Sequence, residues 1–136
     1  MQDLVCDDNY HALLDDGIYD AQCIKFDNSF VLRKARKLFL HFSVVDEGRY
    51  HGKRLFMAFN LPFDFRVKSG SKYYKTWVMV NGWMRPSKNA RMSPRLFLNK
   101  IFKIKTRVVK PKHHDKLMPE TFWYSVVDEI IQVIAG

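Results

Sequence analysis

Apolar and polar residues alternate with a period of two along five stretches of the chain. This period is typical of β-strands that bury one side. The predicted strands span residues 18–26, 37–45, 53–61, 102–109 and 124–134. Residues 27–29 (Asp-Asn-Ser) and the glycine-containing segment 46–52 are typical of turns, and they would connect the first three strands.

The second and third predicted strands have two distinct faces. The apolar positions would face the core, and they are Leu38, Leu40, Phe42, Val44, Leu55, Met57, Phe59 and Leu61. The opposite face would carry Phe39, His41, Arg54, Phe56 and Asn60. A shift of one residue in either strand would exchange its faces, so this assignment depends on the register.

The period changes between residues 62 and 101, which predicts helices there. Ser71 is a typical N-cap, and Asn81-Gly82 is a typical helix end. Ser93 followed by Pro94 predicts a second short helix. The apolar stripe of the first helix, at i, i+3 and i+4, would be Tyr74, Trp77 and Val78.

The predicted fold class is mainly β with a helical insert. Three strands, two short helices and two further strands follow the order of the five-stranded OB-fold barrel, which has its helix between strands three and four. An open α+β sheet is the alternative. We expect residues 17–136 to form one OB-fold domain and residues 1–16 to form an acidic N-terminal segment.

Charge indicates the class of partner. The formal net charge is +9, and residues 17–136 hold all 23 Lys and Arg residues but only nine acidic ones. A domain this basic favours a polyanionic partner, with nucleic acid first and an anionic membrane second.

The cysteines and the hydropathy favour a cytoplasmic protein with no membrane contact. Cys6 and Cys23 lack CxxC spacing, and Cys23 fits a small core position in the first strand. The first residues do not resemble a signal peptide, and no apolar run approaches the roughly 20 residues of a membrane span.

The predicted topology gives the basic residues a shared location. OB barrels bind single strands across strands two and three, between the loop joining strands one and two and the loop joining strands four and five. Both loops are basic here, and we expect them to border one groove. The cations are Arg33, Lys34, Arg36 and Lys37, then Lys103, Lys105 and Arg107 on strand four, and Lys110, Lys112 and Lys116 beside His113 and His114.

The floor of this groove would supply stacking surfaces. Phe39 and Phe56 would face solvent unless bases stack on them, with His41, Arg54 and Asn60 as polar contacts. Packing of either ring under the helical insert is the alternative. Trp83, after Gly82, is a further residue expected to stack on bases.

No motif for catalysis is present. P-loop, GxGxxG, GxSxG and HExxH patterns are missing from the sequence, and a domain with so few acids is a poor nuclease. His113-His114-Asp115 alone does not complete a metal site. We therefore predict a protein that is not an enzyme, with no catalytic residues, no cofactor and no metal.

Seven short segments, taken together and in order, resemble OB-fold single-stranded-DNA-binding proteins of phages, plasmids and integrative mobile elements. They are residues 17–21, 38–42, 48–50, 52–56, 59–61, 97–102 and 124–127. The resemblance implies a role in replication, recombination or transfer of mobile DNA. The chain differs from many bacterial single-strand binders, which end in an acidic tail, because this sequence ends in Val-Ile-Ala-Gly.

The sequence therefore predicts a largely sequence-independent single-stranded DNA-binding protein. An RNA-binding OB module is one alternative, since no motif reads the ribose hydroxyl. A protein-interaction or inhibitor module of a mobile element is another, because exposed aromatics also serve protein interfaces. Whether the protein forms a homo-oligomer or contacts replication and recombination proteins stays open.

Overall fold

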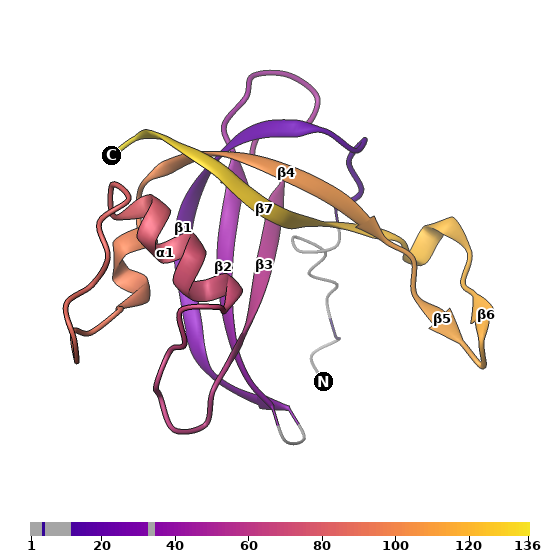
Figure 1. Cartoon of the computed structure of the whole chain (residues 1–136). Helices are drawn as coiled ribbons and strands as arrows, with labels where there is room; N and C mark the ends of the chain where they lie inside the picture. Colours follow the sequence, from indigo (N-terminus) through magenta and orange to yellow (C-terminus); the bar gives the residue numbers. More distant parts are fainter. Residues whose placement is uncertain (1–3, 5–11, 33–34) are drawn as a thin grey trace.

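Five antiparallel strands form one sheet in the computed structural model, which describes residues 4, 12–32 and 35–136. The strands are β1 (Ile18–Leu32), β2 (Ala35–Val44), β3 (Arg54–Leu61), β4 (Ile101–Val109) and β7 (Tyr124–Ala135). They are ordered β3-β2-β1-β4-β7, and the sheet is strongly curved (Figure 1). The mainly β class predicted from the alternating pattern is confirmed.

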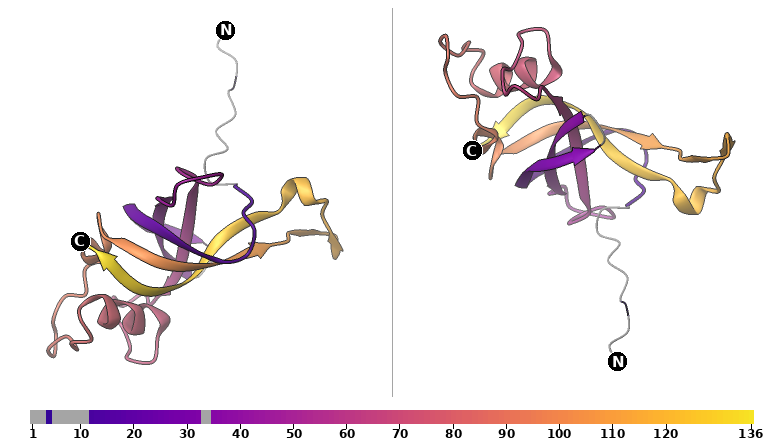
Figure 2. Two further views of the ribbon diagram at one scale, coloured as in Figure 1. Left: turned by 90° about the horizontal axis from the view of Figure 1, so that it is seen from above. Right: turned by 90° about the horizontal axis from the view of Figure 1, so that it is seen from below.

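The curvature brings the two ends of the strand order together. In Figure 2 the sheet curls around the side chains of the core, and β3 and β7 contact one another. The Phe56 ring on β3 lies 6.2 Å from the Tyr124 ring on β7. Register shifts interrupt β1 after Cys23 and after Asp27, and such bulges bend a strand and increase its twist.

The bulges also explain why the turn predicted at residues 27–29 is wrong. Asp27 pairs with Phe39, and β1 continues to Leu32, whose partner is Ala35. The irregularity between Asp27 and Phe30 accommodates the polar residues without ending the strand. The described residues of the first predicted cationic cluster, Arg36 and Lys37, therefore lie on β2 rather than in a loop.

The faces predicted for β2 and β3 are confirmed. The sequence-predicted core residues of both strands are buried, apart from Leu61, which is half-buried at the end of β3. A chain of ring contacts crosses the core from Phe42 through Phe102, Phe97 and Tyr73 to Phe59. Cys23 is also buried, and this burial raises the pKa of its thiol to about 12.

One α-helix lies between β3 and β4. Helix α1 (Lys72–Val80) begins after Ser71, whose hydroxyl accepts a hydrogen bond from the Tyr74 amide, as the sequence predicts. Tyr73 rather than Tyr74 is buried on it. The second predicted helix is instead the four-residue 3₁₀ turn η1 (Pro94–Phe97). It ends early because Asn99 adopts φ 65° and donates its amide hydrogen to the Cys23 carbonyl, which draws the chain into the sheet.

Two further features complete the arrangement. The predicted loop between β4 and β7 holds a small hairpin, β5 (Lys112–His113) and β6 (Lys116–Leu117), and then the 3₁₀ turn η2 (Glu120–Phe122). Before β1, Leu14 is buried and its amide donates to Ser125 Oγ over 2.8 Å. No helix in the described ranges is long and apolar enough to cross a membrane.

Candidate nucleic-acid interface

A row of aromatic rings crosses the outer face of the sheet. Phe39 on β2 and Phe56 on β3 lie with ring centroids 5.7 Å apart in an edge-to-face arrangement. Tyr124, the first residue of β7, continues the row beyond Phe56 at 6.2 Å. All three side chains are half-buried rather than enclosed in the core. Neighbouring Ala58 is exposed, so the small side chain leaves the floor beside Phe39 open.

Polar groups flank this row on the same face. Lys25 of β1, His41 of β2 and Phe56 of β3 are consecutive cross-strand partners, and Arg54 is two residues from Phe56. Burial is the main cause that lowers the pKa of His41 below its usual value, and the nearby Lys25 and Arg54 lower it further while Asp27 opposes them. At neutral pH the His41 imidazole is therefore uncharged, and it can both donate and accept hydrogen bonds.

One end of the row carries part of the first predicted cationic cluster. Lys37 faces the same side as Phe39 and donates a hydrogen bond to Asn60 Oδ1. Arg36 lies on the other face of β2, because neighbouring residues of a strand alternate. Its guanidinium stacks 3.9 Å from the centroid of the Phe65 ring. Arg33 and Lys34 lie outside the described residues.

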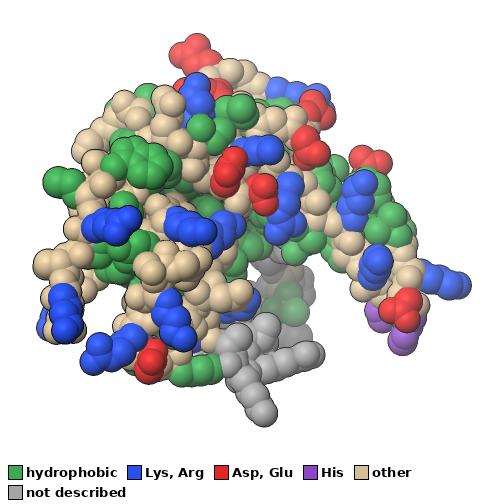
Figure 3. Space-filling model, viewed as in Figure 1, with side chains coloured by type: hydrophobic (Ala, Val, Ile, Leu, Met, Phe, Trp, Pro, Cys, Tyr) green, Lys and Arg blue, Asp and Glu red, His purple; other side chains and the backbone are tan. Residues whose placement is uncertain are grey.

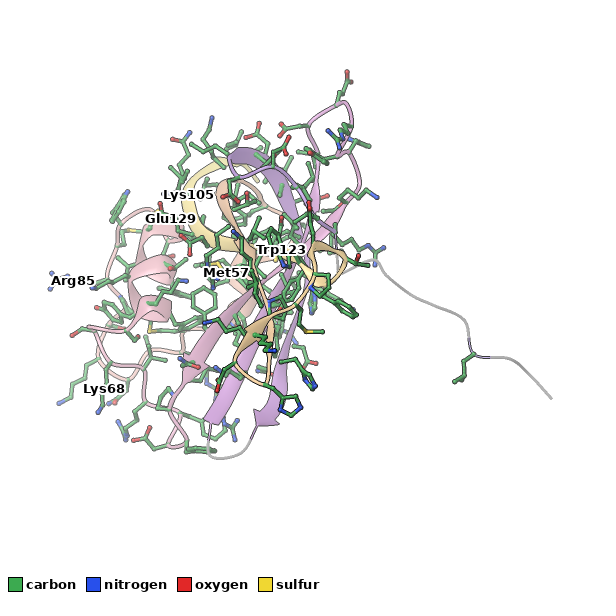
Figure 4. All side chains as sticks on the ribbon, turned by 90° about the vertical axis from the view of Figure 1, so that its right-hand side faces the viewer. Met57, Lys68, Arg85, Lys105, Trp123 and Glu129 are labelled. Atoms are coloured by element: carbon green, nitrogen blue, oxygen red, sulfur yellow. The ribbon has the colours of Figure 1, made fainter. Side chains whose placement is uncertain are left out.

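The other border is the extension between β4 and β7. Lys110 Nζ lies 4.5 Å from the Trp123 ring centroid, and Trp123 precedes Tyr124. Exposed Lys112 and Lys116 lie on β5 and β6 farther out. Figure 1 shows this hairpin projecting on the β3 side of the sheet, and Figure 4 shows Trp123 at its base, in front of the β2 and β3 ribbons.

The cations of β4 lie elsewhere, which differs from the expectation that they border the groove. Arg107 forms an ion pair with Asp128 over 3.0 Å, and Lys105 is the cross-strand partner of Glu129. Lys103 is likewise the partner of Asp20 on β1. These side chains lie on the outside of β4, whose neighbours are β1 and β7 rather than β2 and β3. Lys103, Lys105 and Arg107 are therefore not part of the interface.

Trp83 also lies apart from the aromatic row. It follows α1 with φ 64° and is 74% exposed. With Lys72, Lys75 and Ile130 it lines a separate hollow beside the second half of β7. Its exposure is as the sequence indicated, but the structure does not bring it together with Phe39 and Phe56.

The chain matches no protein-family model, no curated protein and no solved structure. Within the part of the chain that the structure describes, no group of three or more His, Cys, Asp or Glu side chains could hold a metal ion.

Sequence reasoning missed three residues of the interface. Tyr124 was counted as the first residue of the fifth strand, and neither Trp123 nor Lys25 was given a role. The signal that could have found the two aromatics is their position directly after a basic loop. Their contacts with Phe56 and Lys110 depend on how the sheet curves, which periodicity does not report.

Proposed function

We propose that this protein is a single-stranded DNA-binding protein that binds largely without regard to sequence and catalyses no reaction. One observation carries the proposal: the ring row of Phe39, Phe56 and Tyr124 lies on an outer sheet face between two cationic borders. Lys37 stands at one border, and Lys110 with the β5–β6 hairpin at the other.

We further propose that the fold is an OB barrel closed between β3 and β7. The strand order β3-β2-β1-β4-β7 is the order an OB barrel has when opened at that seam. The Phe56–Tyr124 ring contact supports the closure, because it joins the two strands at the ends of the order. Closure also accounts for the position of the row, since OB folds bind oligonucleotides across strands two and three.

The chemistry favours unpaired bases over duplex. Each base has a flat π-face that stacks on a ring regardless of sequence, and in a duplex these faces are already covered by neighbouring base pairs. The cations at the two borders would neutralise phosphates. With the resemblance to mobile-element proteins, this supports a role in replication, recombination or transfer of mobile DNA.

A salt-series titration tests the proposal. Labelled oligo-dT and a duplex of equal length are titrated at several salt concentrations, with fluorescence anisotropy as the readout. Each phosphate contact made by a single strand contributes roughly −0.7 to the slope of log K against log salt. We expect tight, salt-dependent binding of oligo-dT and weaker binding of the duplex. Equal affinity for both would refute stacking, and a matched RNA oligomer decides between DNA and RNA.

A protein-interaction module is the second candidate, and a specific observation favours it. Trp83 and Met84 are 74% and 64% exposed on the turn after α1, on a surface separate from the ring row. Exposed tryptophan is typical of protein hot spots. Under this alternative, the titration would show no salt-dependent binding of either oligomer.

A further inference from the structure

A hollow of about 960 Å³ opens at the end of the sheet where β2 begins. Leu38, Leu61 and Tyr73 contribute to its lining, and its walls are drawn from residues 64–67 and 86–94. The second wall is fastened to α1 by two hydrogen bonds. Tyr73 Oη donates to the Met92 carbonyl over 2.6 Å, and Trp77 Nε1 donates to the Ser93 carbonyl over 3.0 Å. The shape of the hollow is therefore supported by the core of the domain.

The lining of this hollow is strongly cationic. It contains Arg36, Arg66, Lys88 and Arg91, and Asp64 is the acidic residue among the described side chains that line it. In Figure 3, Lys and Arg side chains gather on the lower left of the molecule, around the segments that precede and follow α1. The Asp64 carboxylate accepts a hydrogen bond from the backbone amide of Arg66, so part of its capacity to accept hydrogen bonds from the cationic side chains is already used.

Arg36 combines a ring contact within the fold with a donor that no described residue satisfies. Its guanidinium lies over the Phe65 ring, which is 71% exposed and held at φ 60°. Arg36 Nε is buried, and it has no hydrogen-bond acceptor among the residues described. A guanidinium stacked on an open ring binds phosphate with its remaining donors, and the ring offers a surface for a base.

The hollow begins one residue beyond the end of the ring row along β2, on the opposite face of the sheet. Lys37 pairs with Asn60 across β2 and β3, and the next pair of the same ladder is Arg36 with Leu61. Successive strand residues rise only about 3.3 Å. A nucleic-acid strand that passes Lys37 and turns around the end of the sheet therefore meets Arg36, which lines the hollow together with Arg66.

We propose that this hollow binds a nucleotide of the same nucleic-acid strand as it leaves the ring row, with its phosphate held by Arg36, Arg66 and Arg91. The volume lies within the range of pockets that hold small organic ligands, and a nucleotide is such a ligand. The inference rests on the proposed function. The hollow would add contacts to the nucleic-acid strand beyond the ring row. The affinity for an oligomer and its salt dependence should therefore continue to rise with oligomer length.

The test compares labelled oligo-dT of about 4 and about 16 nucleotides, the range covered by single OB folds. The variants are Arg66→Ala/Arg91→Ala, whose side chains are exposed, and Arg36→Met, which keeps an apolar stem. The matched control, Arg49→Ala/Lys53→Ala, removes two exposed cations beyond the opposite end of β2. Thermal unfolding checks that each variant is folded.

We expect the short oligomer to bind wild type and every variant alike. For the long oligomer, the Arg66/Arg91 variant should lose roughly 1.4 from the salt slope, while the control retains the wild-type slope. An equal loss of slope in the control, or no loss in the Arg66/Arg91 variant, would refute nucleotide binding in the hollow. Either result would leave the proposed binding at the ring row unaffected. If neither oligomer binds wild type, the proposed function fails as well.

A second arm distinguishes a strand from a free nucleotide. Thymidine monophosphate is added as a competitor of the long oligomer and is also titrated alone. Displacement of only the length-dependent part of the affinity supports the assignment. Pocket-dependent binding of the mononucleotide, without any gain for the long oligomer, would overturn it, because the hollow would then serve a free nucleotide.

Discussion

Phe56 occupies the centre of the ring row, so its replacement by leucine tests the proposed interface most directly. The ring lies between Phe39 at 5.7 Å and Tyr124 at 6.2 Å. Leucine keeps an apolar side chain on the half-buried site but removes the flat surface on which a base could stack. The Phe56→Leu variant therefore separates aromatic stacking from apolar burial.

The expected sizes of the two effects allow them to be told apart. Loss of base stacking should cost about 1–3 kcal/mol per base, which is roughly a 5- to 150-fold rise in the Kd for oligo-dT. An aromatic pair contributes about 0.5–1.5 kcal/mol beyond its buried area, so losing two ring contacts costs about 1–3 kcal/mol of stability. A domain stable by about 5–15 kcal/mol stays folded after that loss.

The assay is anisotropy titration of labelled oligo-dT at one moderate salt concentration, with urea unfolding of the same samples. The matched control is Trp83→Leu, which removes an exposed aromatic from the surface beside α1. We expect Phe56→Leu to weaken binding and leave the salt slope unchanged, since no cation is lost. An unchanged Kd for Phe56→Leu, together with weaker oligo-dT binding by Trp83→Leu, would place the interface on the α1 side. It would refute base stacking on the ring row.

Three further predictions follow from separate contacts. Tryptophan fluorescence should change on oligo-dT binding through Trp123, so Trp123→Phe should remove most of the signal and Trp83→Phe should retain it; the reverse pattern would exclude Trp123 from the groove. Because burial lowers the pKa of His41, the unfolded chain takes up a proton that the folded protein resists, and stability should fall as pH drops below about 6.5. Urea unfolding at pH 7.5 and 5.5 should show a smaller fall for His41→Gln than for wild type, and equal falls would contradict this. Ser125→Ala should cost about 1–3 kcal/mol in the same assay, because Leu14 loses a buried hydrogen bond to the hydroxyl; a cost near zero would show that this segment is not held against β7.

Local patterns were sufficient for the faces of individual strands and for the start of the helix. The alternation around Leu40 and Met57 identified their buried sides, because a strand places successive side chains on opposite faces. Ser71 was identified as an N-cap because its hydroxyl replaces a hydrogen bond missing from the first turn. Both features depend on a few adjacent residues and are therefore encoded locally.

The lengths of elements were harder to predict. The polar residues after Asp27 suggested a turn, but pairing with β2 continues through a bulge to Leu32. The residues after Pro94 suggested a helix, but the amide of Asn99 pairs with the Cys23 carbonyl and ends it after one turn. In both cases hydrogen bonds to another strand outweighed a modest local preference.

Which surfaces lie together was decided by the tertiary structure alone. The sequence by itself determined that the domain is basic, mainly β and aromatic on the outer side of β2 and β3. Only the curvature of the sheet placed Tyr124 next to Phe56, and only the strand order gave the β4 cation Arg107 an acidic partner instead of a place on the groove. The physical reason is that periodicity records which side of a strand is buried, whereas strand order and bulges determine which neighbours that side meets.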